Sequence, residues 1–124
     1  MYQDHTTLQI AGQLLLAFLF LGTGIRNATL KFKQHLDRMV AGGVPQAKLV
    51  LIAGFVMQFA GGILVALDYH RAVGAGILIA FTVLATAIFH RYWRVEEPLL
   101  RHLHISFIFS NCGVVGGLLL VMAI

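Results

Sequence analysis

The chain has 124 residues and a formal net charge of +4, with 59% hydrophobic and only 11% charged residues. A soluble domain carries about 25% charged residues, so this composition excludes a water-facing globule and favours an integral membrane protein. Its single cysteine, Cys112, excludes an intrachain disulfide framework and a multi-cysteine zinc site.

Four long stretches carry no Asp, Glu, Lys or Arg: residues 5–25, 49–67, 72–90 and 102–124. A helix needs about 20 apolar residues to cross a bilayer core of roughly 30 Å, and inside lipid the backbone must satisfy its own hydrogen bonds. We therefore predict an all-α integral membrane bundle, a single domain over residues 1–124. Its four transmembrane helices are expected at about 8–25, 49–67, 72–89 and 103–124.

Between the first two predicted spans, apolar residues alternate with basic ones. Two interpretations stay open for this segment: a short amphipathic segment in the membrane interface, or a solvated basic loop. The pattern consists of Leu30, Leu36, Met39 and Val40 among Lys31, Lys33, His35 and Arg38.

The basic residues divide unequally between the two sides of the bundle. Loops 26–48 and 90–102 hold five and three Lys or Arg residues, whereas loop 68–71 holds Arg71 alone. The positive-inside rule places loops 26–48 and 90–102 in the cytoplasm. We therefore expect both termini outside, in the periplasm of a bacterium whose inner membrane holds the protein. His5 and His70 are then expected to be ordinary solvated side chains.

The predicted spans contain no charged side chain, which disfavours ion-coupled transport and paired-carboxylate catalysis. Gln58 and Asn111 lie near the middle of their spans, where a hydrogen bond between helices is the commoner role. Cys112 lies deep in the last span and is expected to be an inert packing residue. Helical spacing puts Thr82, Thr86 and His90 on one face of the third span.

A second polar layer is expected towards the cytoplasmic side. His90, Arg91 and His104 come from different helices and offer donors for the carbonyl oxygens of a quinone, and a histidine can relay a proton as a quinone is reduced. Haem is less favoured, because the sequence offers only one pair of histidines, His90 with His104, for axial ligation. Zinc is less favoured still, because His102 and His104 point apart on a helix, and we expect no metal site.

Four segments of the chain carry distinctive motifs: Leu14–Ile25 in the first span, Gly42-Gly43-Val44-Pro45 before the second, Phe89-His90-Arg91-Tyr92-Trp93 after the third, and Asn111 with Gly116–Leu120 in the last. In their order and spacing these segments resemble the DoxX family of small bacterial membrane proteins. Gln58 stands where that family commonly has Glu, and Ser110 where it commonly has a basic residue.

The resemblance implies a four-helix membrane bundle. The family is named after a subunit associated with thiosulfate:quinone oxidoreductase, and its members are often described as oxidoreductases. Our hypothesis is a membrane subunit of a respiratory or redox complex, not catalytic alone, which works in the lipid bilayer with protein partner subunits. Alternatives are a structural or assembly subunit and, less favoured, a small-molecule transporter. The candidate quinone-binding residues are His90, Arg91, His104, Asn111 and Gln58.

Overall fold

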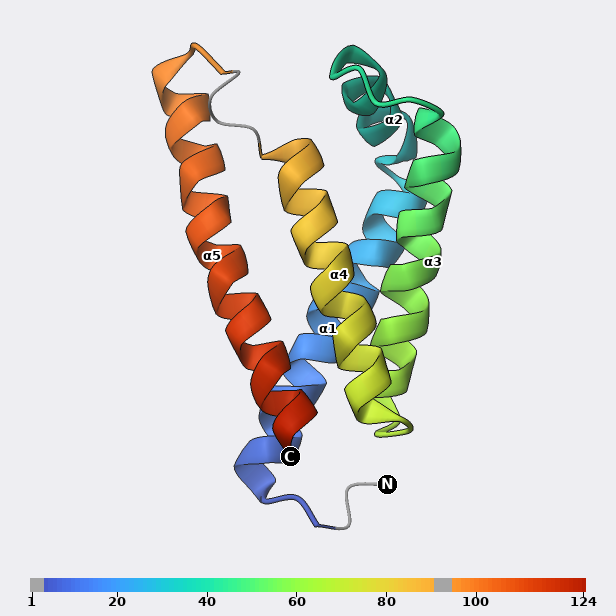
Figure 1. Cartoon of the computed structure of the whole chain (residues 1–124), viewed down its shortest axis with the longest axis vertical. Coiled ribbons are helices and arrows are strands. Elements are labelled where there is room, and N and C mark those ends of the chain that lie inside the picture. The colour runs from blue at the N-terminus through green and yellow to red at the C-terminus, as the bar shows by residue number, and fades with distance from the viewer. Residues whose placement is uncertain (1–3, 91–94) are drawn as a thin grey trace.

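The computed structural model describes residues 4–90 and 95–124, which contain five helices and no strand. The helices are α1 (Thr7–Thr29), α2 (Phe32–Ala41), α3 (Ala47–Ala66), α4 (Arg71–Phe89) and α5 (Pro98–Ala123) (Figure 1). The predicted all-α class is confirmed.

All the predicted spans correspond to helices long and apolar enough to cross a membrane: α1, α3, α4 and α5. Large apolar side chains such as Leu8, 84% exposed, and Phe109, 74% exposed, cover their outer faces, as expected for helices that meet lipid. The last helix begins earlier than predicted, at Pro98 instead of residue 103. The reason is a strong N-terminal cap, in which the Glu97 carboxylate accepts hydrogen bonds from the backbone N–H groups of Leu99 and Leu100.

The segment left open by the sequence is a helix, α2, with one apolar face. Met39 is only 2% exposed and packs with Ala47 and Leu51 of α3. Phe32 and Leu36 of the same face lie against this cluster. These apolar side chains therefore pack the short helix α2 against the end of α3.

Glycines set the closest helix contact, between α3 and α4. A Cβ added at Gly61 would lie 2.8 Å from Cγ of Leu78 and 3.0 Å from the backbone oxygen of Gly74. Small residues allow this approach, which replaces the hydrophobic drive that is absent in lipid. Around it Val65 and Ala75 are fully buried.

The start of α1 and the end of α5 lie at the same end of the bundle (Figure 1). A cluster of polar side chains closes this end. In the turn between α3 and α4, Oδ1 of Asp68 lies 3.1 Å from Nε2 of His5 and accepts a hydrogen bond from Nε2 of Gln13 at 3.0 Å. The His5 side chain is only 4% exposed, so the expectation that it is solvated was wrong. A pairing across 63 residues leaves no signal in the local sequence around His5.

Arg71 extends this cluster to the last helix. Its Nε donates to the backbone oxygen of Val121 at 2.8 Å, and Nη2 donates to the backbone oxygen of Ile124. Nη1 lies 3.4 Å from Oδ1 of Asp68. Arg71 therefore joins the turn before α4 to the end of α5.

The outer face of α5 is the least covered part of the bundle. Cys112 is exposed there, so its expected packing role was wrong. Gly113 and Gly116 have nothing within 4 Å of an added Cβ, whereas Gly117 lies against Leu16 of α1. The sequence of a helix that is apolar all round does not reveal which face meets its neighbours.

Candidate functional site

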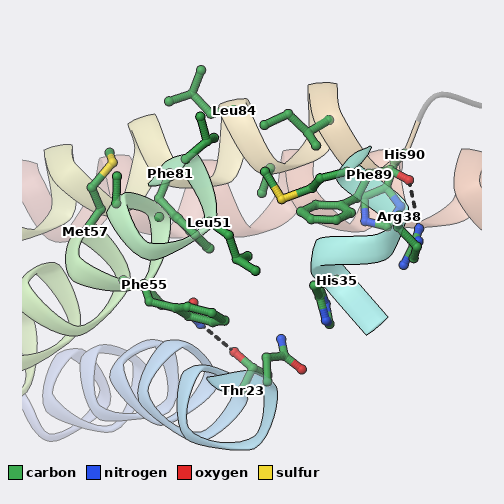
Figure 2. A pocket seen from close by; sticks show the side chains of 18 residues that line it. Thr23, His35, Arg38, Leu51, Phe55, Met57, Phe81, Leu84, Phe89 and His90 are labelled. Atoms are coloured by element: carbon green, nitrogen blue, oxygen red, sulfur yellow. Dashed lines mark hydrogen bonds between the residues drawn. The ribbon is translucent and has the colours of Figure 1, made fainter. Parts of the chain in front are cut away.

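A cavity of about 410 Å³ lies between α1, α2, α3 and α4 (Figure 2). This volume falls in the range of about 300–1,000 Å³ that small-molecule sites occupy. Most of its wall is apolar, including Leu51, Phe55, Met57, Phe81, Leu84 and Phe89. The cavity therefore suits a ligand with a large hydrophobic part.

Polar side chains from each surrounding helix also reach this cavity. Thr23 and Asn27 come from α1, Gln58 from α3, and His90 from the end of α4. His35 and Arg38 come from α2, one helical turn apart. A largely apolar site with a few convergent polar groups is the usual form of a site that orients a small molecule.

Gln58 is held against α1. Its Nε2 donates to the backbone oxygen of Phe20 at 2.8 Å and to Oγ1 of Thr23 at 3.0 Å, the bond drawn in Figure 2. The residue is 3% exposed. A glutamine buried this deeply must hydrogen-bond, and these two bonds also tie α3 to α1.

Arg38 and His35 are positioned by Phe89 at the end of α4. The guanidinium of Arg38 donates from Nη2 to the backbone oxygen of Phe89 at 3.2 Å and lies 5.2 Å from the centre of the Phe89 ring. The His35 ring meets the same ring edge-on, with centres 5.3 Å apart. Sequence reasoning did not select His35 and Arg38, although a helical wheel places both beside the buried Met39.

His90 and His104 meet at the edge of the cavity. Their Nδ1 atoms are 3.1 Å apart, and the His90 ring packs against Phe107 with centres 5.0 Å apart. Burial first, and then the charges of His104 and Arg38, lower the pKa of His90 from 6.5 to about 4. At neutral pH His90 is therefore uncharged and can share a single proton with His104.

The predicted site residues separate into two groups. Gln58 and His90 line the cavity. His104 touches His90 from outside the lining, and Asn111 donates from Nδ2 to Oγ1 of Thr86 at 2.8 Å, an α4–α5 contact away from the cavity. Arg91 lies outside the described residues. The structure therefore brings Gln58 and His90 to one cavity and leaves His104 and Asn111 outside its lining, and ligand binding by these residues stays a prediction.

The DoxX family model matches residues 9–91. The chain belongs to the DoxX family. Every residue that lines the cavity lies inside this DoxX range, whereas α5 lies beyond it. No curated protein and no solved structure matches the chain.

Proposed function

We propose that this DoxX protein is a membrane subunit of a redox complex that binds a quinone in the cavity between α1, α2, α3 and α4. The observation that supports this proposal is the pairing of an apolar cavity of about 410 Å³ with the polar groups of Arg38, Gln58 and His90. A quinone has the matching form, with a flat polar headgroup and an apolar tail. Its electrons would come from a cofactor-bearing partner subunit.

Different cavity residues would contact different parts of such a ligand. The Arg38 guanidinium presents donors that suit a carbonyl oxygen. Phe55 and Phe89 offer aromatic faces for a flat ring. The shared proton of the His90–His104 pair lies beside the cavity, where reduction of a quinone requires protons.

Quinone binding is tested by titrating the purified chain in lipid nanodiscs with decyl-para-benzoquinone and mapping an azido-quinone photoprobe by mass spectrometry. We expect labelled peptides from α2 and α3. Ala53→Phe puts a ring into the cavity, because Ala53 lines it, and should abolish saturable binding. Lys33→Gln, an exposed change on α2 outside the lining, is the matched control. Unchanged binding in Ala53→Phe would exclude this cavity as the site.

The orientation in the membrane is also a proposal. The eight Lys and Arg residues in loops 26–48 and 90–102 support a cytoplasmic location for those loops in a bacterial inner membrane. In a Cys112→Ala background, Lys33→Cys should react with a membrane-impermeant maleimide only after the membrane is opened, and His70→Cys should react in intact spheroplasts. The reverse pattern would invert the topology.

A role as a structural partner has its own support in α5. Gly113 and Gly116 leave open space where a side chain would stand, on a helix whose outer face is exposed. We propose that a membrane helix of the partner subunit packs there, since small residues favour close approach. The Gly113→Leu change should remove the partner from native pull-downs and leave the melting temperature of the isolated chain unchanged.

A further inference from the structure

The amide of Gln58 has a defined orientation, because both of its hydrogen-bond partners are acceptors. The backbone oxygen of Phe20 can only accept. The hydroxyl of Thr23 donates its hydrogen to the backbone oxygen of Leu19 at 2.6 Å, so its oxygen accepts from Gln58. Both amide hydrogens of Gln58 are therefore committed to α1.

The packing of α1 keeps this orientation. A Cβ added at Gly24 would lie 3.2 Å from both Cδ and Nε2 of Gln58, so the nitrogen side of the amide rests directly on the α1 backbone. Turning the amide over would set Oε1 against the backbone oxygen of Phe20. The two oxygens would repel, and the buried amide would lose both hydrogen bonds.

The remaining polar atom of Gln58 is Oε1, which accepts no hydrogen bond from the described residues, 4–90 and 95–124. Gln58 is 3% exposed and lines the cavity. Oε1 does not belong to the fully enclosed side-chain atoms that have no partner, so it keeps surface that a ligand in the cavity can reach. A carbonyl oxygen in a largely apolar wall gains free energy when a donor reaches it. A ligand that brings an O–H group to this wall satisfies the atom, and a ligand that brings a carbonyl oxygen does not.

His35 adds a second acceptor to the same cavity. Its Nδ1 lies 2.8 Å from the backbone oxygen of Lys31, and because a carbonyl cannot donate, Nδ1 carries the hydrogen. In the neutral ring Nε2 is then an acceptor. Two acceptors on different walls match the two hydroxyl groups of a hydroquinone.

We propose that the cavity selects the reduced, hydroxyl-bearing form of its ligand, a quinol, over the oxidised quinone, through the acceptor Oε1 of Gln58. This inference rests on the proposed quinone site and adds the redox state that the site prefers. It concerns binding alone and involves no electron transfer.

The test compares three probes of one size class: decyl-hydroquinone, its dimethyl ether and decyl-para-benzoquinone. Their affinities for the full chain in nanodiscs are measured anaerobically by calorimetry. We expect the hydroquinone to bind about tenfold more tightly than either other probe, the value of one well-formed hydrogen bond. Equal affinities for all three would overturn the inference and leave the proposed function standing. Binding of none would remove the proposed function and this inference together.

A variant pair assigns the preference to Gln58. In Gln58→Met the tenfold preference should disappear, while the benzoquinone still binds. Gln13→Met is the matched control, because Gln13 is equally buried, also donates to a backbone oxygen, that of Val65, and lies at the opposite end of the bundle. If Gln58→Met folds and keeps the preference, Gln58 is not its source. If Gln58→Met does not fold, Gly24→Ala, whose Cβ would lie 3.2 Å from the Gln58 amide, and the wild-type comparison of the three probes decide the outcome.

Discussion

The Nδ1 atoms of His90 and His104 lie 3.1 Å apart, which joins the end of α4 to α5 through one shared proton. One ring must donate and the other accept, so the contact would break when both Nδ1 atoms carry a hydrogen. The neighbouring Arg38 charge acts in the same direction on His90.

The pH dependence of stability follows from this pair. The pKa of His90 is lowered from 6.5 to about 4, so between these values the unfolded chain binds more protons than the folded one. Stability should therefore fall as the pH drops from 6.5 towards 4. Thermal unfolding from pH 7 to pH 4 should show this slope, and His90→Gln should flatten it. An identical slope in both proteins would contradict the assignment.

Gly24 should control ligand preference through Gln58. Gly24→Ala places a Cβ 3.1 Å from Cζ of Phe59 and 3.2 Å from the Gln58 amide, so the amide must shift. We expect weaker hydroquinone binding, by about tenfold, in the same calorimetric assay. Gly22→Ala is the control, since its Cβ meets only Cε2 of Phe18 at 4.0 Å. Equal losses in both variants would point to a general effect on α1.

The α3–α4 contact should tolerate no side chain at Gly61. Gly61→Ala drives a Cβ into Leu78 and the Gly74 backbone and should cost about 1–3 kcal/mol of stability. Gly76→Ala, where nothing lies within 4 Å, should leave stability equal or raise it by up to about 1 kcal/mol. Steric-trap unfolding in bicelles measures both. If Gly61→Ala left the stability unchanged, the α3–α4 contact would not depend on the absence of a side chain at this position.

Arg71 should hold the end of α5. Arg71→Met removes the bonds to the backbone oxygens of Val121 and Ile124, and we expect a loss of about 1.5–3 kcal/mol, typical of hydrogen bonds to a charged group. Arg71→Lys should restore only part of it, because an ammonium lacks the forked geometry. Lys33→Met is the exposed control. In Arg71→Met, backbone hydrogen exchange should become faster only in the last turns of α5, which would assign the lost stability to this end of the helix.

Much of the fold could be predicted because charge is so sparse in this chain. The uncharged stretches mark four membrane helices, and the basic loops mark one end of the bundle. The structure of the segment 30–40 stayed open, because the same alternation suits a surface helix and a basic loop. The packing of Met39 against Leu51 of α3 shows that the segment is a surface helix, and this contact cannot be read from the local sequence.

The candidate site was less accessible to sequence reasoning. Gln58 and Asn111 lie at comparable positions along their helices, yet Gln58 bonds to Phe20 of α1 and Asn111 to Thr86 of α4. In helices that are apolar all round, periodicity does not show which face points inward. His35 and Arg38 were missed for a related reason, since only the packing of α2 turns them towards the cavity.

The polar cluster around Asp68 and Arg71 gives the bundle an asymmetric mechanical design. It ties three parts of the chain at one end, while at the other end α5 stands apart from α2 and α3 (Figure 1). At that other end α4 meets α5 through His90 and His104, and α2 is bonded to α4 through Arg38. The bundle is therefore closed by an arginine–carboxylate cluster at one end and by a histidine pair at the other, so acidification towards pH 4 should loosen the cavity end first.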